Sequence, residues 1–159
     1  MPKANKKEWL NMIEIKRCEN PDVLNEFSIV PNDGTVVMAA CEKEEYFGVG
    51  VATINGNYSV LEKIEMKDEY KMFDMDFGMG KSVLNMLDLA GIRYVFSNIE
   101  DERLMTALRF KKNADIPEDV RPNKTYKYFL CLDGYFTVHK CDGEWVEYTE
   151  LKQKRVQRN

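Results

Sequence analysis

The sequence is poor in the residues that build metal centres and disulfide frameworks. It contains one histidine, and its four cysteines lie far apart without a Cys-x-x-Cys pair: Cys18, Cys41, Cys131 and Cys141. A zinc site needs about four such ligands at short spacings, so none is expected. The cysteines are expected to be reduced thiols in the core, which suits a cytoplasmic protein.

Long apolar runs are also missing. No stretch approaches the roughly 18 apolar residues of a transmembrane helix. The basic residues 1–7 are not followed by the apolar core of a signal peptide. We therefore expect a cytoplasmic protein without a membrane partner. No linker rich in proline and glycine divides the chain, which predicts one domain over 1–159 with flexible basic tails at 1–7 and 152–159.

Charge is unevenly distributed along the chain. The formal net charge is −4, yet residues 1–7 and 152–159 contain basic side chains and no acidic ones. The body between these tails is therefore more acidic than the total suggests. Because an acidic body repels phosphate backbones, no nucleic-acid partner is expected.

Hydrophobic periodicity predicts a mixed α/β chain. The first part is expected to form strands at 12–17, 35–43, 46–54 and 58–66, with a short helix at 21–28. The sequence Asn55-Gly56-Asn57 indicates a tight turn, so the last two of these strands should be antiparallel.

The second part alternates between helices and strands. An apolar stripe predicts a helix at 78–91, which is followed by a buried strand of the parallel type at 92–96 and a helix at 101–111. Strands at 126–132 and 135–141 are predicted to form a hairpin, and 145–151 a further edge strand. Since edge strands often pair between subunits, a homodimer is possible.

The most informative motif is Gly78-Met79-Gly80-Lys81-Ser82, between a predicted strand and a predicted helix. Glycines allow a backbone to approach a ligand, and a helix start offers free N–H groups to phosphate. The glycines are equally compatible with a plain turn. A triphosphatase loop is disfavoured, because Met75 stands where its first glycine is required.

The order of these elements resembles the GNAT (general N-acetyltransferase) superfamily over residues 35–112. The resemblance implies a GNAT-like acyl-CoA N-acyltransferase fold, with a mostly antiparallel sheet and a central parallel βαβ unit whose strands splay apart. It also implies acetyl-CoA as the cofactor. By the resemblance, Gly78, Met79, Gly80, Lys81 and Ser82 hold the pyrophosphate, the backbone of Met66 holds the pantetheine arm, and Asn98 makes a supporting contact.

Three positions depart from the family pattern. Met75 replaces the glutamine or arginine that opens the family's motif, and Arg109 replaces a glycine before Phe110. Met105 stands where many members carry the tyrosine that protonates the leaving thiolate. These departures place the general acid elsewhere or imply that it is absent.

Glu62 is the candidate general base. Strict alternation along 58–66 places it on one face with Val60, Ile64 and Met66. Partial burial among apolar neighbours would make its carboxylate a stronger base, and GNAT enzymes often carry a glutamate on this strand. The alternative is that the carboxylate points into water.

The sequence therefore predicts an acetyl-CoA-dependent N-acetyltransferase that acts on a primary amine of a small molecule or peptide. One alternative is a catalytically degenerate GNAT-like module that binds CoA or a protein partner. Another is a structural domain whose glycine motif binds nothing.

Overall fold

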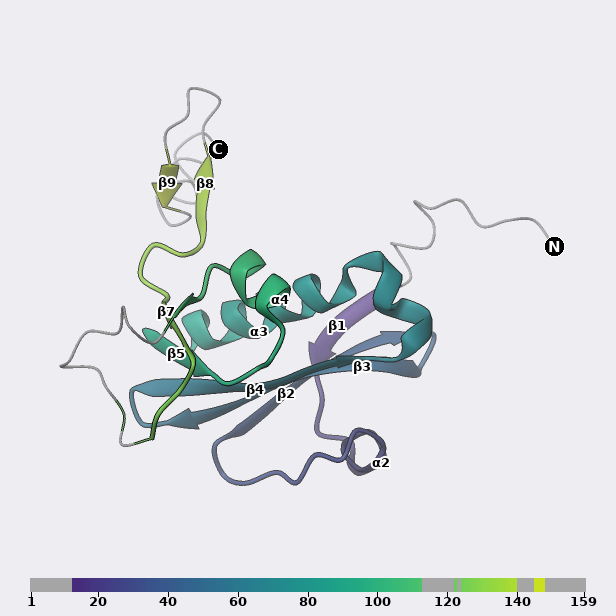
Figure 1. Ribbon diagram of the computed structural model, residues 1–159. Helices are drawn as coiled ribbons and strands as arrows, with labels where there is room; N and C mark the ends of the chain where they lie inside the picture. Colours follow the sequence, from purple (N-terminus) through teal and green to yellow (C-terminus); the bar gives the residue numbers. More distant parts are fainter. Residues whose placement is uncertain (1–12, 113–121, 123, 140–144, 148–159) are drawn as a thin grey trace, which may run out of the picture.

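The computed structural model describes residues 13–112, 122, 124–139 and 145–147, and the predicted tails lie outside them (Figure 1). Its main feature is a seven-stranded sheet in the order β1-β2-β3-β4-β5-β7-β6. The strands are β1 (Ile13–Arg17), β2 (Thr35–Glu42), β3 (Glu45–Asn55), β4 (Tyr58–Met66), β5 (Tyr94–Ser97), β6 (Lys111–Lys112) and β7 (Tyr128–Cys131). Among the described strands of this sheet, β4 and β5 alone pair in parallel. The predicted mixed α/β fold is confirmed.

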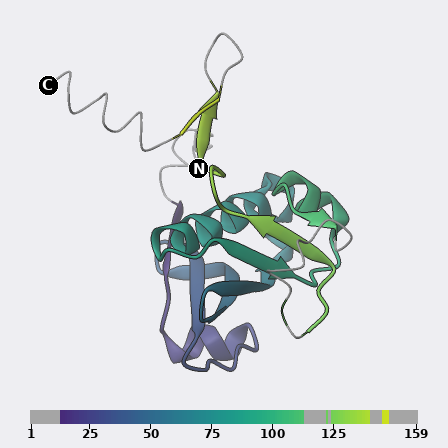
Figure 2. The same ribbon diagram turned by 90° about the vertical axis from the view of Figure 1, so that its left-hand side faces the viewer.

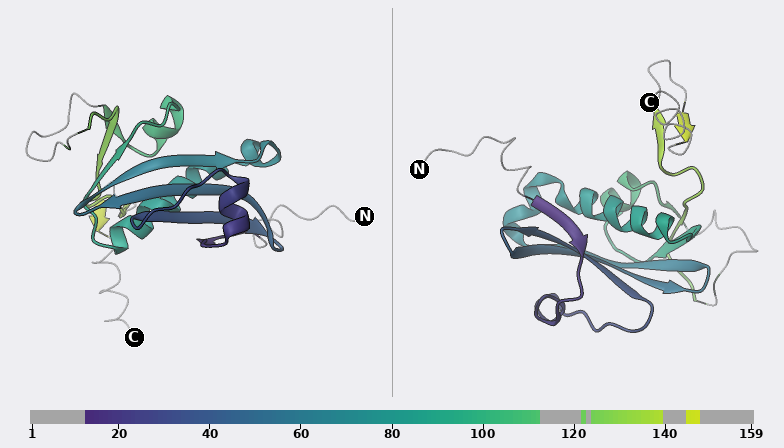
Figure 3. Two further views of the ribbon diagram at one scale, coloured as in Figure 1. Left: turned by 90° about the horizontal axis from the view of Figure 1, so that it is seen from below. Right: turned by 180° about the vertical axis from the view of Figure 1, so that it is seen from behind.

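Helices cover both faces of the sheet. The long helix α3 (Met75–Leu89) and the short α4 (Glu102–Ala107) lie on one face, and α2 (Pro21–Glu26) lies on the other (Figures 1 and 3). A 3₁₀ helix, η1 (Asp68–Phe73), connects β4 to α3. None of the described helices has the length and apolarity to cross a membrane.

Local signals explain where several elements begin and end. The Asn20 side chain accepts a hydrogen bond from the Asp22 N–H at 3.0 Å, and Pro21 occupies the first position of α2. Gly56, at φ 65°, forms the tight turn between β3 and β4. Gly91, at φ 85°, ends α3 while the Ile92 N–H returns to the Leu87 carbonyl.

The core lies mainly between α3 and the sheet. Met79, Val83, Leu84 and Leu87 of α3 are fully buried, and they pack with residues of β2 to β5, α4 and β7. A second cluster joins α2 to β2 and β3, and a third, around Phe96, lies between β4, β5 and the start of β7. The described part of the molecule therefore has three layers: α3 with α4, the sheet, and the short helix α2.

Two sequence predictions about the elements are wrong. The helix predicted from residue 78 begins at Met75, because the polar run before it folds into η1 and leads directly into α3. The strand predicted to form a hairpin with 126–132 instead contributes β8 (Thr137–His139), which pairs with β9 (Trp145–Glu147) in a separate two-stranded sheet (Figure 2). β7 lies between β5 and β6.

Candidate functional site

The centre of the candidate site is the point where β4 and β5 separate. Their parallel pairing runs from Tyr58 and Tyr94 to Leu61 and Ser97, although β4 continues to Met66. The Ser97 hydroxyl donates to the Leu61 carbonyl at 2.8 Å and accepts from the Ile99 N–H at 3.2 Å, which fixes this point. Beyond it, the β5-facing edge of β4 has no strand partner among the described residues. Such an edge offers backbone groups to a ligand.

Glu62 lies directly after this point, on a β-bulge. Ala52 pairs with Leu61 and the adjacent Val51 pairs with Lys63, so Glu62 is the extra residue of β4. A bulge turns side chains away from strict alternation. The prediction that Glu62 shares one face with Val60, Ile64 and Met66 is therefore wrong. Val60 packs with Phe96, whereas Ile64 and Met66 pack in the cluster that contains the buried residues of α3. The Glu62 side chain is exposed.

Tyr126 lies near Glu62 and was not predicted as a site residue. Its ring packs 5.4 Å from that of Phe96, in the same buried cluster as Val60. Burial raises the pKa of Tyr126, and the nearby Tyr58 and Glu62 raise it further. The phenol therefore remains protonated at neutral pH. No local signal in the sequence indicates that Tyr126 lies near Glu62, because the two residues are far apart in the chain.

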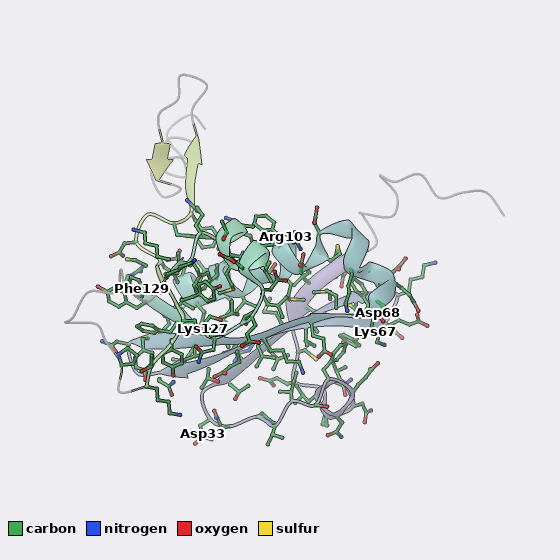
Figure 4. The ribbon with its side chains drawn as sticks, in the orientation of Figure 1. Asp33, Lys67, Asp68, Arg103, Lys127 and Phe129 are labelled. Atoms are coloured by element: carbon green, nitrogen blue, oxygen red, sulfur yellow. The ribbon has the colours of Figure 1, made fainter. Side chains whose placement is uncertain are left out.

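Asn98, the predicted supporting residue, follows β5 at the same opening. Its side-chain oxygen accepts a hydrogen bond from the Lys127 N–H at 2.8 Å. Figure 4 shows Lys127 and Phe129 on the β7 side of the sheet, with Lys67 and Asp68 toward the end of β4. Asn98 thus holds the chain entering β7 beside the splay. That it contacts a cofactor stays a prediction.

The glycine motif does not form a loop. Gly78, Met79, Gly80, Lys81 and Ser82 all lie inside α3, and the Ser82 hydroxyl donates to the Gly78 carbonyl at 2.9 Å. Their predicted role rested on free N–H groups at a helix start. That start lies one turn earlier, around Met75, so the predicted local structure is wrong.

Gly80 has a packing role in this helix. A Cβ built at Gly80 would lie 2.7 Å from Leu108 Cδ1 and 3.2 Å from Ile64 Cδ1, whereas one at Gly78 meets nothing within 4 Å. The absence of a side chain at Gly80 therefore lets α3 approach Leu108 at the end of α4. Met79 and Met105 are fully buried in the same core. Met105 is accordingly inaccessible as well as chemically unable to donate a proton.

The start of α3 carries two carboxylates. Asp74, at φ 52°, precedes the helix, and Asp76 Oδ1 accepts from the Phe77 N–H at 2.8 Å. Arg103 of α4 lies 3.0 Å from Asp76 Oδ2 and 3.8 Å from Asp74 Oδ1 (Figure 4). The acids complement the helix dipole. They also oppose the approach of a phosphate group to the free N–H groups there.

A hollow of about 530 Å³ lies between α2, the β2–β3 turn and η1. Its lining includes the carboxylates of Asp22, Glu26, Glu44, Glu45 and Glu69, and one lysine, Lys67. Phe47 and Tyr70 stack in its wall with ring centroids 3.8 Å apart. Lys67, which follows the last residue of β4, forms an ion pair with Glu26. The hollow is therefore acidic, aromatic and adjacent to the end of β4.

The architecture matches solved acetyltransferase structures. A GNAT-family acetyltransferase from Staphylococcus aureus has a TM-score of 0.56 at 16% identity, over 76% of this chain and 99% of its own. The chain has the GNAT fold. The ribosomal-protein-S18-alanine N-acetyltransferase of Escherichia coli has a TM-score of 0.59 at 12% identity, over 76% of this chain and 94% of its own. Tetrahymena GCN5 has a TM-score of 0.52 at 6% identity, over 64% and 70%. No protein-family model and no curated protein matches the sequence.

The GNAT fold inferred from the sequence is thus confirmed, and it allows the predicted cofactor site to be tested against the residues present. The splay fits an extended arm, because no described residue pairs with the edge of β4 beyond Leu61, and Met66 is the last residue on it. The helix start fits a pyrophosphate less well, because Asp74 and Asp76 occupy it. The residues present therefore fit the thioester end of acetyl-CoA better than its pyrophosphate.

Proposed function

We propose that this chain is an acetyl-CoA-dependent N-acetyltransferase that acts on a cationic primary amine. The observation that carries the proposal is the β4–β5 splay of a GNAT fold, with Glu62 exposed on a bulge beside it. A glutamate turned out of the regular strand at this point is available to a bound amine. Neighbouring GNAT folds, described as acetyltransferases, support the same class of reaction.

In this proposal the residues of the chain prepare the amine and hold the donor. When bound, acetyl-CoA supplies an activated acyl thioester. The edge of β4 from Glu62 to Met66 binds the extended arm through backbone hydrogen bonds, and Ser97 fixes the point at which β4 and β5 separate. Glu62 removes a proton from the ammonium group, directly or through one water. Tyr126 remains protonated near Glu62. Because Met105 has no proton to donate, Tyr126 is our candidate for the residue that protonates the leaving thiolate.

The acidic hollow supports a cationic acceptor. Carboxylates attract an ammonium group, and the ring of Tyr70, which stacks on the buried Phe47, favours contact with a cation. The hollow begins at Lys67, directly after the last residue of the free β4 edge. We therefore propose an amine carrying more than one positive charge, or a basic peptide, as the acceptor.

The first test is calorimetric titration with acetyl-CoA, with magnesium–ATP as the control. We expect acetyl-CoA alone to bind. Transfer to a panel of amines is then followed for the wild type and for Glu62→Gln, with Glu65→Gln as the matched control on the same strand. General-base catalysis contributes about 10²- to 10⁴-fold, so Glu62→Gln should lower kcat by at least about 100-fold and leave acetyl-CoA affinity unchanged. Equal kcat values for the two variants would rule out Glu62 as the base.

A second candidate function is a GNAT-fold module without transfer activity. Two observations favour it: the carboxylates at the start of α3 oppose phosphate, and Met105 is buried where the family has a tyrosine. Absence of acetyl-CoA binding in the calorimeter would favour this candidate. Binding without transfer to any amine would favour a CoA-sensing form of it.

A further inference from the structure

Two cationic side chains converge on one tyrosine ring away from the splay. Lys81 Nζ lies 4.4 Å from the ring centroid of Tyr135, and the guanidinium carbon of Arg109 lies 4.1 Å from it. The rings of Phe136 and Phe77 lie 5.5 and 5.7 Å from Lys81 Nζ. These residues come from α3, the turn after α4 and the segment after β7.

Neither cation has a carboxylate partner within ion-pair distance among the described residues. By contrast, Arg93, Arg103 and Lys127 each form an ion pair with an aspartate or glutamate. Uncompensated neighbouring cations are unexpected in a chain whose net charge is −4. Burial and the nearby Arg109 both lower the pKa of Lys81, which shows that the two charges oppose each other.

The cluster is held in place by hydrogen bonds. Arg109 Nη2 donates to the Tyr135 carbonyl at 2.6 Å, and the Tyr135 hydroxyl donates to the Leu108 carbonyl at 2.8 Å. Arg109 adopts φ 66°, a conformation that costs a residue other than glycine about 1 kcal/mol. Its guanidinium is therefore fixed beside Lys81 before any ligand arrives, which lowers the entropic cost of binding.

We infer that Lys81 and Arg109 form a binding site for a phosphate-bearing ligand, a phosphate monoester or a diphosphate. A dianion there would neutralise both cations and accept hydrogen bonds from the guanidinium fork and the ammonium group. Lys81 is six residues after Met75, so the site lies about one and two-thirds helical turns after the start of α3. The same helix therefore disfavours phosphate at Asp74 and Asp76 and favours it at Lys81. This inference does not depend on the proposed acetyl transfer.

The test is a two-dimensional NMR titration of the full chain with inorganic pyrophosphate. We expect the largest shifts at Lys81, Arg109 and Tyr135, and a weaker affinity at higher salt. Lys81→Gln should weaken binding by about tenfold, because it removes one charge-assisted contact. The matched control Lys127→Gln removes an ion-paired surface lysine and should bind as the wild type does.

Arg109→Lys keeps the positive charge but loses the guanidinium hydrogen bond to the Tyr135 carbonyl. If this variant still binds pyrophosphate, the charge at position 109 and not the Tyr135 contact is what the ligand requires. No shift with pyrophosphate, shifts centred on 75–77, or equal affinity in wild type and Lys81→Gln would each overturn the inference. A second arm uses coenzyme A. If Lys81→Gln weakens the binding of coenzyme A as strongly as the binding of pyrophosphate, the site binds a phosphate of the cofactor. If it weakens the binding of pyrophosphate alone, the site serves a separate phosphate ligand. Absence of acetyl-CoA binding beside intact pyrophosphate binding would reject the proposed function alone.

Discussion

The packing of α3 makes a sharp prediction about its two motif glycines. Gly78 and Gly80 lie two residues apart in the same helix, so each change to alanine adds the same methyl group to the same kind of backbone. Alanine in a helix is more stable than glycine by about 0.5–1 kcal/mol. At Gly78 the added Cβ meets nothing within 4 Å. Gly78→Ala should therefore stabilise the protein by about 0.5 kcal/mol, given its place near the helix start.

At Gly80 the same methyl group meets a filled core. Its Cβ would lie 2.7 Å from Leu108 Cδ1 and 3.0 Å from Leu108 Cδ2, and Leu108 is fully buried. Overpacking of this kind costs about 1–3 kcal/mol. Because the propensity gain is common to both variants, Gly80→Ala should be less stable than Gly78→Ala by about 1–3 kcal/mol.

Urea unfolding at 25 °C measures both free energies, with equal m-values as the check on two-state behaviour. Leu108→Ala removes both δ carbons and leaves only Ile64 Cδ1, at 3.2 Å, in tight contact, so in that background Gly80→Ala should destabilise much less. The reasoning is refuted if Gly80→Ala is as stable as Gly78→Ala in the presence of Leu108. That result would mean that α3 does not approach Leu108 through Gly80.

Two further changes test the surroundings of the site. Tyr135→Phe removes the hydrogen bond to the Leu108 carbonyl and should cost about 1 kcal/mol at pH 7. Because burial raises the pKa of Tyr135 above its ordinary value of 10.0, its stabilising effect is complete below that pH and is lost as the pH rises through the raised pKa; urea unfolding at pH 7 and above pH 10 should show the wild type losing more stability than the variant, and equal losses would contradict this. Asp101→Ala removes the side chain that caps α4 through the Leu104 N–H at 3.0 Å and should lower the free energy of unfolding by about 1 kcal/mol, whereas Asp101→Asn should largely preserve it.

The sequence was a reliable guide where structure depends on local signals. The strands from Thr35 to Met66 were predicted because turn residues and β-branched runs specify them within a few positions. The start of α3 was missed because the polar run between Met66 and Gly78 resembles a loop, whereas η1 leads it directly into the helix. The hairpin predicted between 126–132 and 135–141 was also wrong, although a tight turn does form at Gly134, at φ 68°. β7 pairs with β5 and β6, and these pairings depend on contacts distant in the sequence.

The candidate site was predicted in kind but not in detail. Glu62 was identified from alternation, yet its exposure comes from the bulge opposite Val51 and Ala52, which the sequence does not mark. Tyr126 reaches the site through packing on Phe96, another contact between distant segments. The glycine motif was assigned to ligand binding because its pattern cannot distinguish a phosphate loop from close helix packing. The position of Leu108 distinguishes them.

The distribution of charge along α3 relates the proposed reaction to the inferred phosphate site. A helix start attracts anions through its free N–H groups, but carboxylates in the first turn use the same favourable potential. Asp76 does so here, and Arg103 stabilises it by an ion pair. A phosphate that approaches α3 therefore gains more from Lys81 and Arg109, which form no ion pair with any described residue, than from the helix start. If acetyl-CoA binds in the splay, we expect its phosphates to lie toward this cationic pair.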